Sequence, residues 1–445
     1  MHGQQRWPIC TLTKKTEGNS ANCWYKRRRM YRLSVRVFLP ACFLAVSLLA
    51  SAYPPHAGAA TPPDSPPSLI AIGDVHGDFN DFVAILQRTG LIDEQHHWAG
   101  GKTTLVQTGD LLDRGPKPRE VMDLMISLEQ EAPKAGGRVV ALMGNHEMMN
   151  LMGDLRYVTP ENYASFSDGE SEQRRKTAYQ EYAAWRKSHP QLLAELEQPV
   201  LAVTEEEWMT RHPLGFIEQR DAFGPNGVYG KWLRQRFALA KIGGVIFLHG
   251  GISPALVSMK LKLDEINAHI HGEIKDFDDA RQSLVAEKLI LPFFTLQETV
   301  AVVRAELVAE RKSHLPANAL RQAKIERLLT LGTWLSVRTD GPLWFRDYDQ
   351  WGDGDGAPQV EKILAAYHAT NIVVGHTVQK TAHIRTRFGG KVFLIDTGML
   401  ASYYPGGKAS ALEIRDDDRF TATYLDQQEV LLEGKSAQSG QKDNK

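Results

Sequence analysis

Five short segments of the sequence combine glycine with side chains that can bind metal ions. Glycine lets the backbone turn sharply and leaves room for ions and phosphate oxygens. The neighbouring carboxylate, imidazole and amide groups supply oxygen and nitrogen ligands. One such segment is usually only a turn, whereas a series of them along one chain indicates a shared chemical site. The segments are Gly73–Asp78, Gly109–Gly115, Gly144–Glu147, His249–Gly251 and Gly375–Thr377.

The spacing of these side chains is suited to two metal ions. Asp74 and His76 lie two residues apart and could bind one cation, and Asp110 could bridge two cations through its separate oxygens. The second ion would be completed by Asn145, His249 and His376. Oxygen and imidazole ligands without sulfur favour manganese, iron or zinc. Two such ions about 3.5–4 Å apart can clamp both oxygens of an in-line displacement at phosphorus, so the sequence predicts a site that hydrolyses phosphoesters.

A short apolar run precedes each of these segments, and one more follows the last of them. This is the pattern of buried strands that end at polar turns. Stretches with helical spacing at 79–89 and 119–131 lie between the first three runs, and this alternation predicts a layered α/β fold. Ligands gather at the strand ends of such folds. The predicted strands are 69–72, 104–107, 138–142, 245–248, 371–374 and 391–395.

The ordered part of the chain is predicted to cover residues 68–433. Two charged, mostly helical stretches, at about 150–236 and 258–335, interrupt its strands and are interpreted as insertions that could cap the site. The proline-rich segment 61–67 is expected to be an extended linker. The polar segment 434–445 is expected to be a disordered tail.

The first sixty residues differ in composition from the rest of the chain. A basic stretch at 26–36 precedes an apolar run at 37–52, and Ala57–Ala59 offers a small-residue cleavage site. This order predicts a secretory signal peptide over 1–60, because the apolar run is short for a transmembrane helix. We therefore expect an exported protein, periplasmic or secreted. An uncleaved membrane anchor is the alternative, and translation could also start at Met30.

The amino-acid composition excludes some kinds of chemistry and some binding partners. Of the 445 residues, 42% are hydrophobic and 24% are charged, which is typical of a globular protein. The three cysteines, Cys10, Cys23 and Cys42, all lie in the leader, so the cleaved protein would have neither disulfides nor thiolate chemistry. Residues 61–445 hold 43 Lys and Arg against 52 Asp and Glu, a net charge of −9. Such a chain is a poor candidate for binding nucleic acid, and membrane contact is expected only through an uncleaved leader.

Together the motifs resemble the signature of calcineurin-like metallophosphoesterases, and the serine/threonine-type phosphoprotein phosphatases fit best. The motifs are Asp74-x-His76, Gly109-Asp110-x-x-Asp113-Arg114-Gly115, Gly144-Asn145-His146-Glu147, His249-Gly250-Gly251 and Gly375-His376. The resemblance implies a layered β-sandwich flanked by helices. About a hundred residues separate His146 from His249, more than a minimal member of the family would have. Gly341–Asp347, the insertions and the leader make the chain look like the Shewanella-like phosphatase subfamily.

The resemblance also implies a role for each matching residue. Asp74, His76 and Asp110 would hold the first metal ion, with Asp110, Asn145, His249 and His376 on the second. His146 would be the general acid that protonates the leaving group, and Asp113 would orient and charge it. Arg114 and Arg346 would bind phosphate oxygens, for which the planar guanidinium group is suited. Glu147 is expected to be structural and to hold a ligand loop in place.

The implied function is that of an exported phosphomonoesterase of the phosphoprotein phosphatase type. A hydroxide bridging two Mn, Fe or Zn ions would attack phosphorus directly, without a covalent phosphoenzyme. By family analogy, the substrate is a phosphorylated protein, peptide or small molecule, with phosphate on Ser, Thr or Tyr. Tyr403–Gly407 could line the pocket or form a surface loop. The alternatives are a diadenosine-tetraphosphate hydrolase and a non-catalytic metal-binding scaffold.

Overall fold

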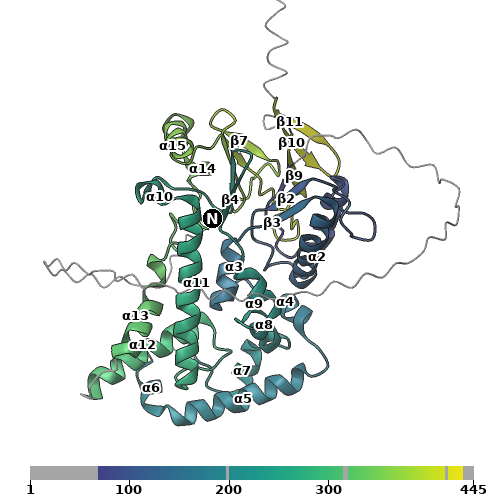
Figure 1. Ribbon diagram of the computed structural model, residues 1–445. Helices are drawn as coiled ribbons and strands as arrows, with labels where there is room; N and C mark the ends of the chain where they lie inside the picture. Colours follow the sequence, from purple (N-terminus) through teal and green to yellow (C-terminus); the bar gives the residue numbers. More distant parts are fainter. Residues whose placement is uncertain (1–68, 197–199, 314–318, 416–418, 434–445) are drawn as a thin grey trace, which may run out of the picture. The chain divides into compact units, whose positions relative to one another are not determined.

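The computed structural model describes residues 69–196, 200–313, 319–415 and 419–433 (Figure 1). The predicted signal peptide, the linker and the C-terminal tail lie outside these residues. Among the described helices, none combines the length and the apolar character that crossing a membrane requires.

A six-stranded mixed sheet carries the first three polar turns. Its strands are β1 (Leu69–Ile72), β2 (Thr104–Gln107), β3 (Arg138–Ala141), β9 (Ser410–Arg415), β10 (Arg419–Tyr424) and β11 (Gln428–Leu432). The strand order is β11-β10-β9-β1-β2-β3. β1, β2 and β3 run parallel, so their carboxyl ends meet at one edge, while β9 pairs antiparallel with β1 and continues into β10 and β11.

A five-stranded mixed sheet carries the last two polar turns. Its strands are β4 (Leu239–Ile242), β5 (Val245–Leu248), β6 (Asn371–Val374), β7 (Arg385–Arg387) and β8 (Val392–Leu394). Their order is β4-β5-β6-β8-β7. The three central strands β5, β6 and β8 are parallel, and both edge strands pair antiparallel with their neighbours. The six predicted strands are confirmed by β1, β2, β3, β5, β6 and β8.

The core lies between the two sheets. One buried cluster contains Val106 and Ile414 from the first sheet together with Phe247 and Val373 from the second. Across the layers, the ring of Phe393 stacks on that of Phe420, with centroids 4.3 Å apart. Fully burying one side chain of this size stabilises a fold by about 1.5–3 kcal/mol. The sheets therefore form a sandwich that holds the strand ends at fixed positions.

Two helices follow the first strands, as predicted. α1 (Phe79–Arg88) begins after Asp78, whose side chain accepts a hydrogen bond from the Asp81 nitrogen at 3.2 Å. α2 (Pro118–Glu131) has proline in its first turn, where the missing N–H is not needed. α2 packs against β3, while its buried residues lie on one face. A short 3-10 helix, η1 (Ala132–Ala135), follows α2.

Helices dominate both long stretches between strands. Between β3 and β4 lie α3 (Asn145–Met152), α4 (Pro160–Phe166), α5 (Ser171–Ser188), α6 (Pro190–Ala194), α7 (Glu205–Arg211), α8 (Phe216–Phe223) and α9 (Val228–Leu233). Between β5 and β6 lie α10 (Pro254–Ser258), α11 (Leu263–Ala286), α12 (Leu296–Ser313), α13 (Ala319–Leu329), η2 (Leu331–Thr333), α14 (Asp347–Gln350) and α15 (Asp353–Ala366). The predicted fold class, an α/β sandwich with largely helical insertions, is confirmed.

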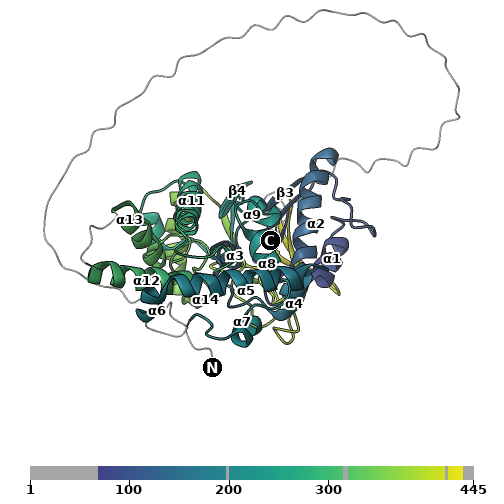
Figure 2. The same cartoon turned by 90° about the horizontal axis from the view of Figure 1, so that it is seen from below.

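The two helical insertions pack against one another, and the sheets lie to one side of them (Figures 1 and 2). Trp185 on α5 donates its indole N–H to the carbonyl of Leu289, 3.2 Å away in the second insertion. Its ring meets that of Phe294 edge-to-face at 5.0 Å. α6 also contacts α12, where Lys312 pairs with Glu195 at 2.7 Å. The insertions thus share a small core of their own.

Candidate active site

The polar turns at the strand ends have an unusual backbone. His76, Asp110 and His376 have φ angles of 50°, 58° and 67°. The consecutive residues Asp113 and Arg114 have φ angles of 67° and 66°. Residues other than glycine rarely adopt this left-handed region, which costs roughly 1–3 kcal/mol each and is found mostly at functional sites. All of these strained residues belong to the site predicted from the sequence.

Two glycines allow the turns to approach one another. A Cβ on Gly109 would lie 2.4 Å from the nitrogen of Gly144, and a Cβ on Gly375 would lie 2.4 Å from Oδ1 of Asp74. No real Cβ fits at such distances, so a larger residue at either position would push two turns apart. The backbone nitrogen of His376 then donates to the same Asp74 oxygen at 2.9 Å. This bond joins the edges of the two sheets.

The first side-chain cluster surrounds Nε2 of His76. This nitrogen lies 3.7 Å from Oδ2 of Asp74 and 3.6 Å from Oδ2 of Asp110. Nδ1 of His76 is 2.8 Å from the carbonyl of Leu112, which turns Nε2 toward the carboxylates. Nε2 of His146 is 3.8 Å from the same Asp110 oxygen. All four side chains are buried, so these atoms are placed to surround one cation.

The second side-chain cluster shares Asp110 with the first. Nε2 of His249 lies 3.3 Å from Oδ2 of Asp110 and 2.8 Å from Oδ1 of Asn145. Nδ1 of His376 is 3.0 Å from the same His249 nitrogen. The same oxygen of Asp110, Oδ2, therefore faces both clusters. The prediction that its two oxygens would each bind one ion does not match this geometry, because Oδ1 instead accepts a hydrogen bond from the His146 backbone nitrogen.

The donor atoms of both clusters suit metal ions. The possible ligand atoms of His76, Asp110 and His146 all lie within 4.8 Å of one another, and so do those of Asp110, His249 and His376. Burial lowers the pKa of His76 and the pKa of His376 well below the usual histidine value. Both imidazoles are thus neutral near pH 7, which is the form that binds a metal ion.

The carboxylates of the site also fit a bound cation. Burial, followed by the charges of Asp396 and Asp110, raises the pKa of Asp74 well above its usual range. Oδ2 of Asp396 is buried and has no hydrogen-bond partner among the described residues. A metal ion would relieve the repulsion among these acids and keep Asp74 ionised. The residues present therefore fit the metal ions that the motifs predict.

His146 and Asp113 form a buried pair beside the first cluster. Nδ1 of His146 lies 2.6 Å from Oδ2 of Asp113. The other oxygen of Asp113 accepts a hydrogen bond from Nδ2 of Asn150 at 2.9 Å. A carboxylate at Nδ1 keeps a proton on that nitrogen and leaves Nε2 toward the cluster. The His146 backbone nitrogen donates to Oδ1 of Asp110 at 3.0 Å, which ties the pair to the bridging carboxylate.

Arg114 reaches into the same place from the turn after β2. One guanidinium nitrogen lies against Nε2 of His76, and the other is 3.1 Å from Nε2 of His146. Its backbone nitrogen donates to the carbonyl of Tyr157 at 3.1 Å. The arginine is therefore held at the mouth of the first cluster.

Aromatic rings surround the Arg114 guanidinium. Its Cζ lies 5.4 Å from the ring centroid of Tyr157, 4.9 Å from that of Tyr403 and 5.5 Å from that of Tyr404. The Tyr404 hydroxyl accepts a hydrogen bond from Arg114 at 2.6 Å. Tyr403 keeps 49% of its surface exposed. Of the two interpretations of Tyr403–Gly407, the structure supports a segment that lines the site.

Arg346 lies beside the second cluster. It donates to the carbonyl of His376 at 2.6 Å and to Oγ1 of Thr377 at 3.3 Å. The arginine itself is exposed to solvent. The structure thus brings all ten predicted site residues into one connected region: Asp74, His76, Asp110, Asp113, Arg114, Asn145, His146, His249, Arg346 and His376.

Glu147 holds two of the turns together. Its carboxylate accepts hydrogen bonds from the backbone nitrogens of Asp110 at 2.7 Å, Leu111 at 2.8 Å and Gly144 at 2.8 Å. Burial, followed by the charge of Asp110, raises the pKa of Glu147 to about 7. Its contacts are all to the loop backbone, as expected of a structural residue.

Several residues at the site were not predicted from the sequence. Asn150 had a usable signal, because it lies four residues after His146 and therefore on the same face of a helix. Asp396 follows a predicted strand and could have been noticed in the same way as the other strand-end acids. Tyr157 and Gln219 had no local signal, since only the packing of the first insertion brings them here.

Comparisons with known proteins agree with this geometry. The sequence pattern of the calcineurin-like phosphoesterase family matches residues 67–380. Shewanella-like protein phosphatase 1 of Plasmodium berghei is 26% identical over 361 residues, covering 80% of this chain and 74% of that protein. Shewanella-like protein phosphatase 2 of Arabidopsis thaliana is 30% identical over 233 residues, covering 49% of this chain and 54% of that protein.

A solved structure is similar over most of the chain. It is that of a cold-active protein-tyrosine phosphatase of a psychrophilic Shewanella species, with a TM-score of 0.52 and 25% identity. The match covers 82% of this chain and 80% of that one. Fold, site and relatives agree: the chain belongs to the calcineurin-like phosphoesterase family, is a metal-dependent phosphoester hydrolase and is similar to the Shewanella-like protein phosphatases.

Proposed function

We propose that this enzyme removes phosphate from tyrosine side chains of proteins or peptides. The observation that carries the proposal is the group of aromatic rings around Arg114, next to His146. The similarity to a protein-tyrosine phosphatase supports the same substrate class. The proposal concerns the substrate, since phosphoester hydrolysis follows from the family itself.

The metal ligands proposed from the sequence keep their assignments. Asp74, His76 and Asp110 would hold one ion, and Asp110, Asn145, His249 and His376 the other. When bound, ions of the Mn, Fe or Zn type supply an activated water and neutralise the charge of the phosphoryl oxygens. The remaining steps, protonation of the leaving group and binding of the phosphoryl oxygens, are assigned to side chains of the protein.

His146 is proposed to protonate the leaving oxygen. Its Nδ1 is engaged by Asp113 at 2.6 Å, so its Nε2 is the nitrogen that can hold a proton toward the site. Asp113 is buried and holds the imidazole in the orientation in which Nε2 faces the site. Because a tyrosine phenol is a poor leaving group with a pKa of about 10, protonation should matter for its release.

The two arginines are proposed to hold the phosphoryl oxygens from opposite clusters. Arg114 contacts His76 and His146 of the first, and Arg346 contacts His376 of the second. A guanidinium group can donate two parallel hydrogen bonds to a phosphate. The contacts of Arg346 with a carbonyl and a hydroxyl group orient its guanidinium group without neutralising its charge.

Tyr403 is the ring best placed to contact a substrate tyrosine. Its neighbour Tyr404 already accepts a hydrogen bond from Arg114 and packs edge-to-face against Tyr403 with centroids 4.9 Å apart. Tyr403 is half exposed beside the guanidinium, so a planar aromatic side chain could pack on it. Such a ring pair contributes about 0.5–1.5 kcal/mol beyond its buried area.

The test compares matched phosphopeptides that differ only in the phosphorylated residue. Metal-loaded enzyme should show the highest kcat/KM for phosphotyrosine, followed by phosphoserine and phosphothreonine. Tyr403→Ala should raise KM for the phosphotyrosine peptide by about 3- to 10-fold. The control Tyr403→Phe keeps the ring and should behave like the wild type.

Three outcomes would contradict the proposal. Faster turnover of the phosphoserine peptide would make the tyrosine preference wrong. Faster turnover of diadenosine tetraphosphate than of every phosphopeptide would favour the dinucleotide alternative. If metal-loaded protein hydrolysed no phosphoester, the scaffold alternative would hold.

We also propose that the enzyme is exported. The support is the order of basic, apolar and Ala57–Ala59 segments in the leader, which lies outside the described residues. Fractionated cells should contain a shortened protein whose N-terminus follows Ala59 or Ala60, measured by N-terminal sequencing. An uncut chain in the cytoplasm would make this proposal wrong.

A further inference from the structure

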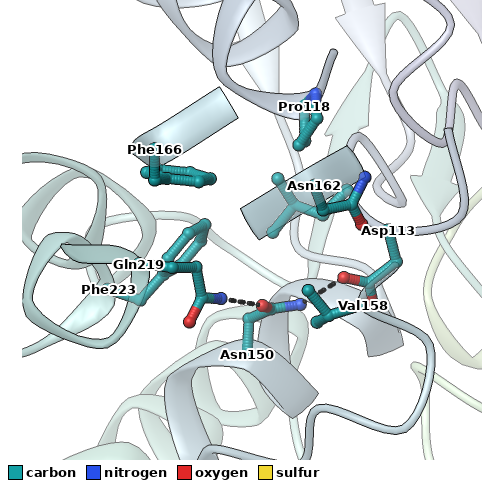
Figure 3. Close-up of a pocket in the computed structure, with 9 residues that line it drawn as sticks. Asp113, Pro118, Asn150, Val158, Asn162, Phe166, Gln219 and Phe223 are labelled. Atoms are coloured by element: carbon teal, nitrogen blue, oxygen red, sulfur yellow. Dashed lines mark hydrogen bonds between the residues drawn. The ribbon is translucent and has the colours of Figure 1, made fainter. Parts of the chain in front are cut away.

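A buried series of hydrogen bonds leads from His146 through Asp113 into helix α8 of the first insertion. Figure 3 shows the part from Asp113 to Gln219. Asp113 accepts from Nδ2 of Asn150 at 2.9 Å, and Oδ1 of Asn150 accepts from Nε2 of Gln219 at 2.8 Å. Asn150 is 1% exposed and Gln219 is 2% exposed. The series of hydrogen bonds therefore runs from His146 through Asp113 and Asn150 to Gln219, and it has no access to bulk water.

We propose that Asn150 and Gln219 are positioning residues for the acid pair, so that the helical insertion takes part in leaving-group protonation. The inference rests on the acid role proposed above for His146. It does not depend on which phosphoester is the physiological substrate.

The hydrogen-bond pattern allows only one orientation of the Asn150 amide. Its nitrogen donates to Asp113 and also to the carbonyl of His146 at 3.0 Å. A flipped amide would place its oxygen against both of these acceptors. Gln219 prevents the flip by donating to the Asn150 oxygen. The insertion thus adds a third hydrogen bond that favours the orientation in which the Asn150 nitrogen meets the catalytic carboxylate.

Helix α8 contacts the end of helix α3 at a second point. NH1 of Arg220 donates to the carbonyl of Asn150 at 3.2 Å. A Cβ on Gly153, at the end of α3, would lie 2.8 Å from NH2 of Arg220. Adjacent residues of α8 therefore hold both the side chain and the backbone of Asn150, which gives the amide a fixed position relative to Asp113.

Asp113 needs this support because its backbone is strained, with a φ of 67°. Strained residues persist only where the surrounding structure holds them, and hydrogen bonds to both carboxylate oxygens fix the orientation of this side chain. One oxygen is held by His146 and the other by Asn150. Loss of the second bond would let the carboxylate rotate and leave the imidazole without a fixed direction.

Few other groups could replace the lost bond. Apart from the residues of the series itself, the small cavity is lined by apolar side chains such as Phe166 and Phe223 and by Asn162 (Figure 3). The Asn162 amide is already bonded to the backbone of Thr159 and Gly115. Oε1 of Gln219 is buried and has no hydrogen-bond partner among the described residues. The glutamine is therefore oriented by its bond to Asn150 and contributes little else that is polar.

The experiment measures kcat for aryl phosphates whose leaving groups differ in basicity. General acid catalysis contributes most when the leaving group is poor. Asn150→Ala and Gln219→Leu should each lower kcat for phenyl phosphate by about 10-fold or more, and change kcat for dinitrophenyl phosphate by less than about 3-fold. Metal content should equal that of the wild type, because neither residue touches a predicted ligand atom.

A matched control separates positioning from packing. Phe223→Leu alters the same helix and the same cavity but removes no hydrogen bond of the chain. It should lower thermal stability as much as Gln219→Leu does, without changing the dependence on the leaving group. If Phe223→Leu gave the same selective loss, helix packing would be the cause and the proposal would be wrong.

A double-mutant cycle completes the test. In a His146→Ala background, Gln219→Leu should change kcat for phenyl phosphate by less than about 2-fold, because the acid it positions is absent. A full additional loss in that background would overturn the positioning role. If His146→Ala lowered kcat equally for phenyl phosphate and for dinitrophenyl phosphate, His146 would not be the general acid. The positioning proposal would then be wrong as well.

Discussion

The loops at the strand ends and the first helical insertion hold polar side chains in different ways. The loops use left-handed backbone and glycine contacts, as at Asp110 and Gly109. The insertion uses ordinary helices, buried aromatic rings and a few buried amides, as at Gln219. The difference teaches that the loops place their polar side chains partly through left-handed backbone, at metal ligands and at Asp113 alike, whereas the insertion supports the acid pair from ordinary, well-packed helices.

The second insertion shows what a helical addition does without such a contact. It reaches the first insertion through the backbone nitrogen of Leu296, which donates to the carbonyl of Gly153 at 2.8 Å, and through Gln297, which donates to Asp154 at 2.9 Å. Neither bond touches the acid pair. Variants in the loops, the first insertion and the second insertion should therefore differ in what they damage.

The largest loss should follow a change in the carboxylate shared by both clusters. Asp110→Asn keeps the size of the side chain but removes the charge that faces His76 and His249. We expect at least one metal ion to be lost and kcat/KM to fall by about 1000-fold or more, measured by elemental analysis and steady-state kinetics. An Asp110→Asn protein with wild-type turnover would show that the metal clusters are not catalytic.

His146→Ala should lower activity less than Asp110→Asn does, and it should distinguish between two possible roles of His146. The geometry places Nε2 of His146 close enough to Asp110 to be a ligand, while the family resemblance makes it the acid. We expect both metal ions to stay and kcat for phenyl phosphate to fall by about 100-fold or more. Loss of metal in proportion to activity would make His146 a ligand instead.

Gly215, which precedes α8 in the first insertion, should not tolerate a larger side chain. A Cβ on Gly215, whose φ is 88°, would lie 1.7 Å from the carbonyl oxygen of Tyr163. Gly215→Ala should lower the free energy of unfolding by about 3 kcal/mol or more, measured in urea. The control Gly272→Ala, on an exposed face of α11 with open space around it, should be neutral or stabilise by about 1 kcal/mol.

The smallest expected effect is a pH dependence within the insertion. Burial lowers the pKa of His212 to about 4, and its ring stacks on Trp208 with centroids 4.1 Å apart. The unfolded chain, with a histidine pKa of about 6.5, takes up the proton first, so stability falls as pH falls from about 6.5 towards about 4.

His212→Phe should remove this part of the acid sensitivity. Between about pH 7.5 and about pH 5 the wild type should lose about 2 kcal/mol more than the variant. Urea titrations at the two pH values measure the difference. Equal losses in both proteins would show that His212 is not held neutral.

The strand-end residues were predictable because local sequence determines them. Asp74 and His376 each follow a short apolar strand and sit beside glycine, so the pattern is visible without the fold. Gln219 was not predictable, since it lies 69 residues from Asn150 and only the packing of α8 brings the two together. The strands β9, β10 and β11 were missed because the predicted strands were short, mainly apolar runs, whereas β10, for example, alternates polar and apolar residues along its length.

The order in which a ribosome makes this chain bears on when the site can exist. The hydrogen bond between His376 and Asp74 joins residues 302 apart, and Leu69 of β1 pairs with Ile414 of β9. One edge of β1 therefore stays unpaired until nearly the whole chain has emerged from the ribosome. A nascent chain that ends before β6 lacks His376 altogether, so the second metal cluster can be completed only after most of the chain has been made.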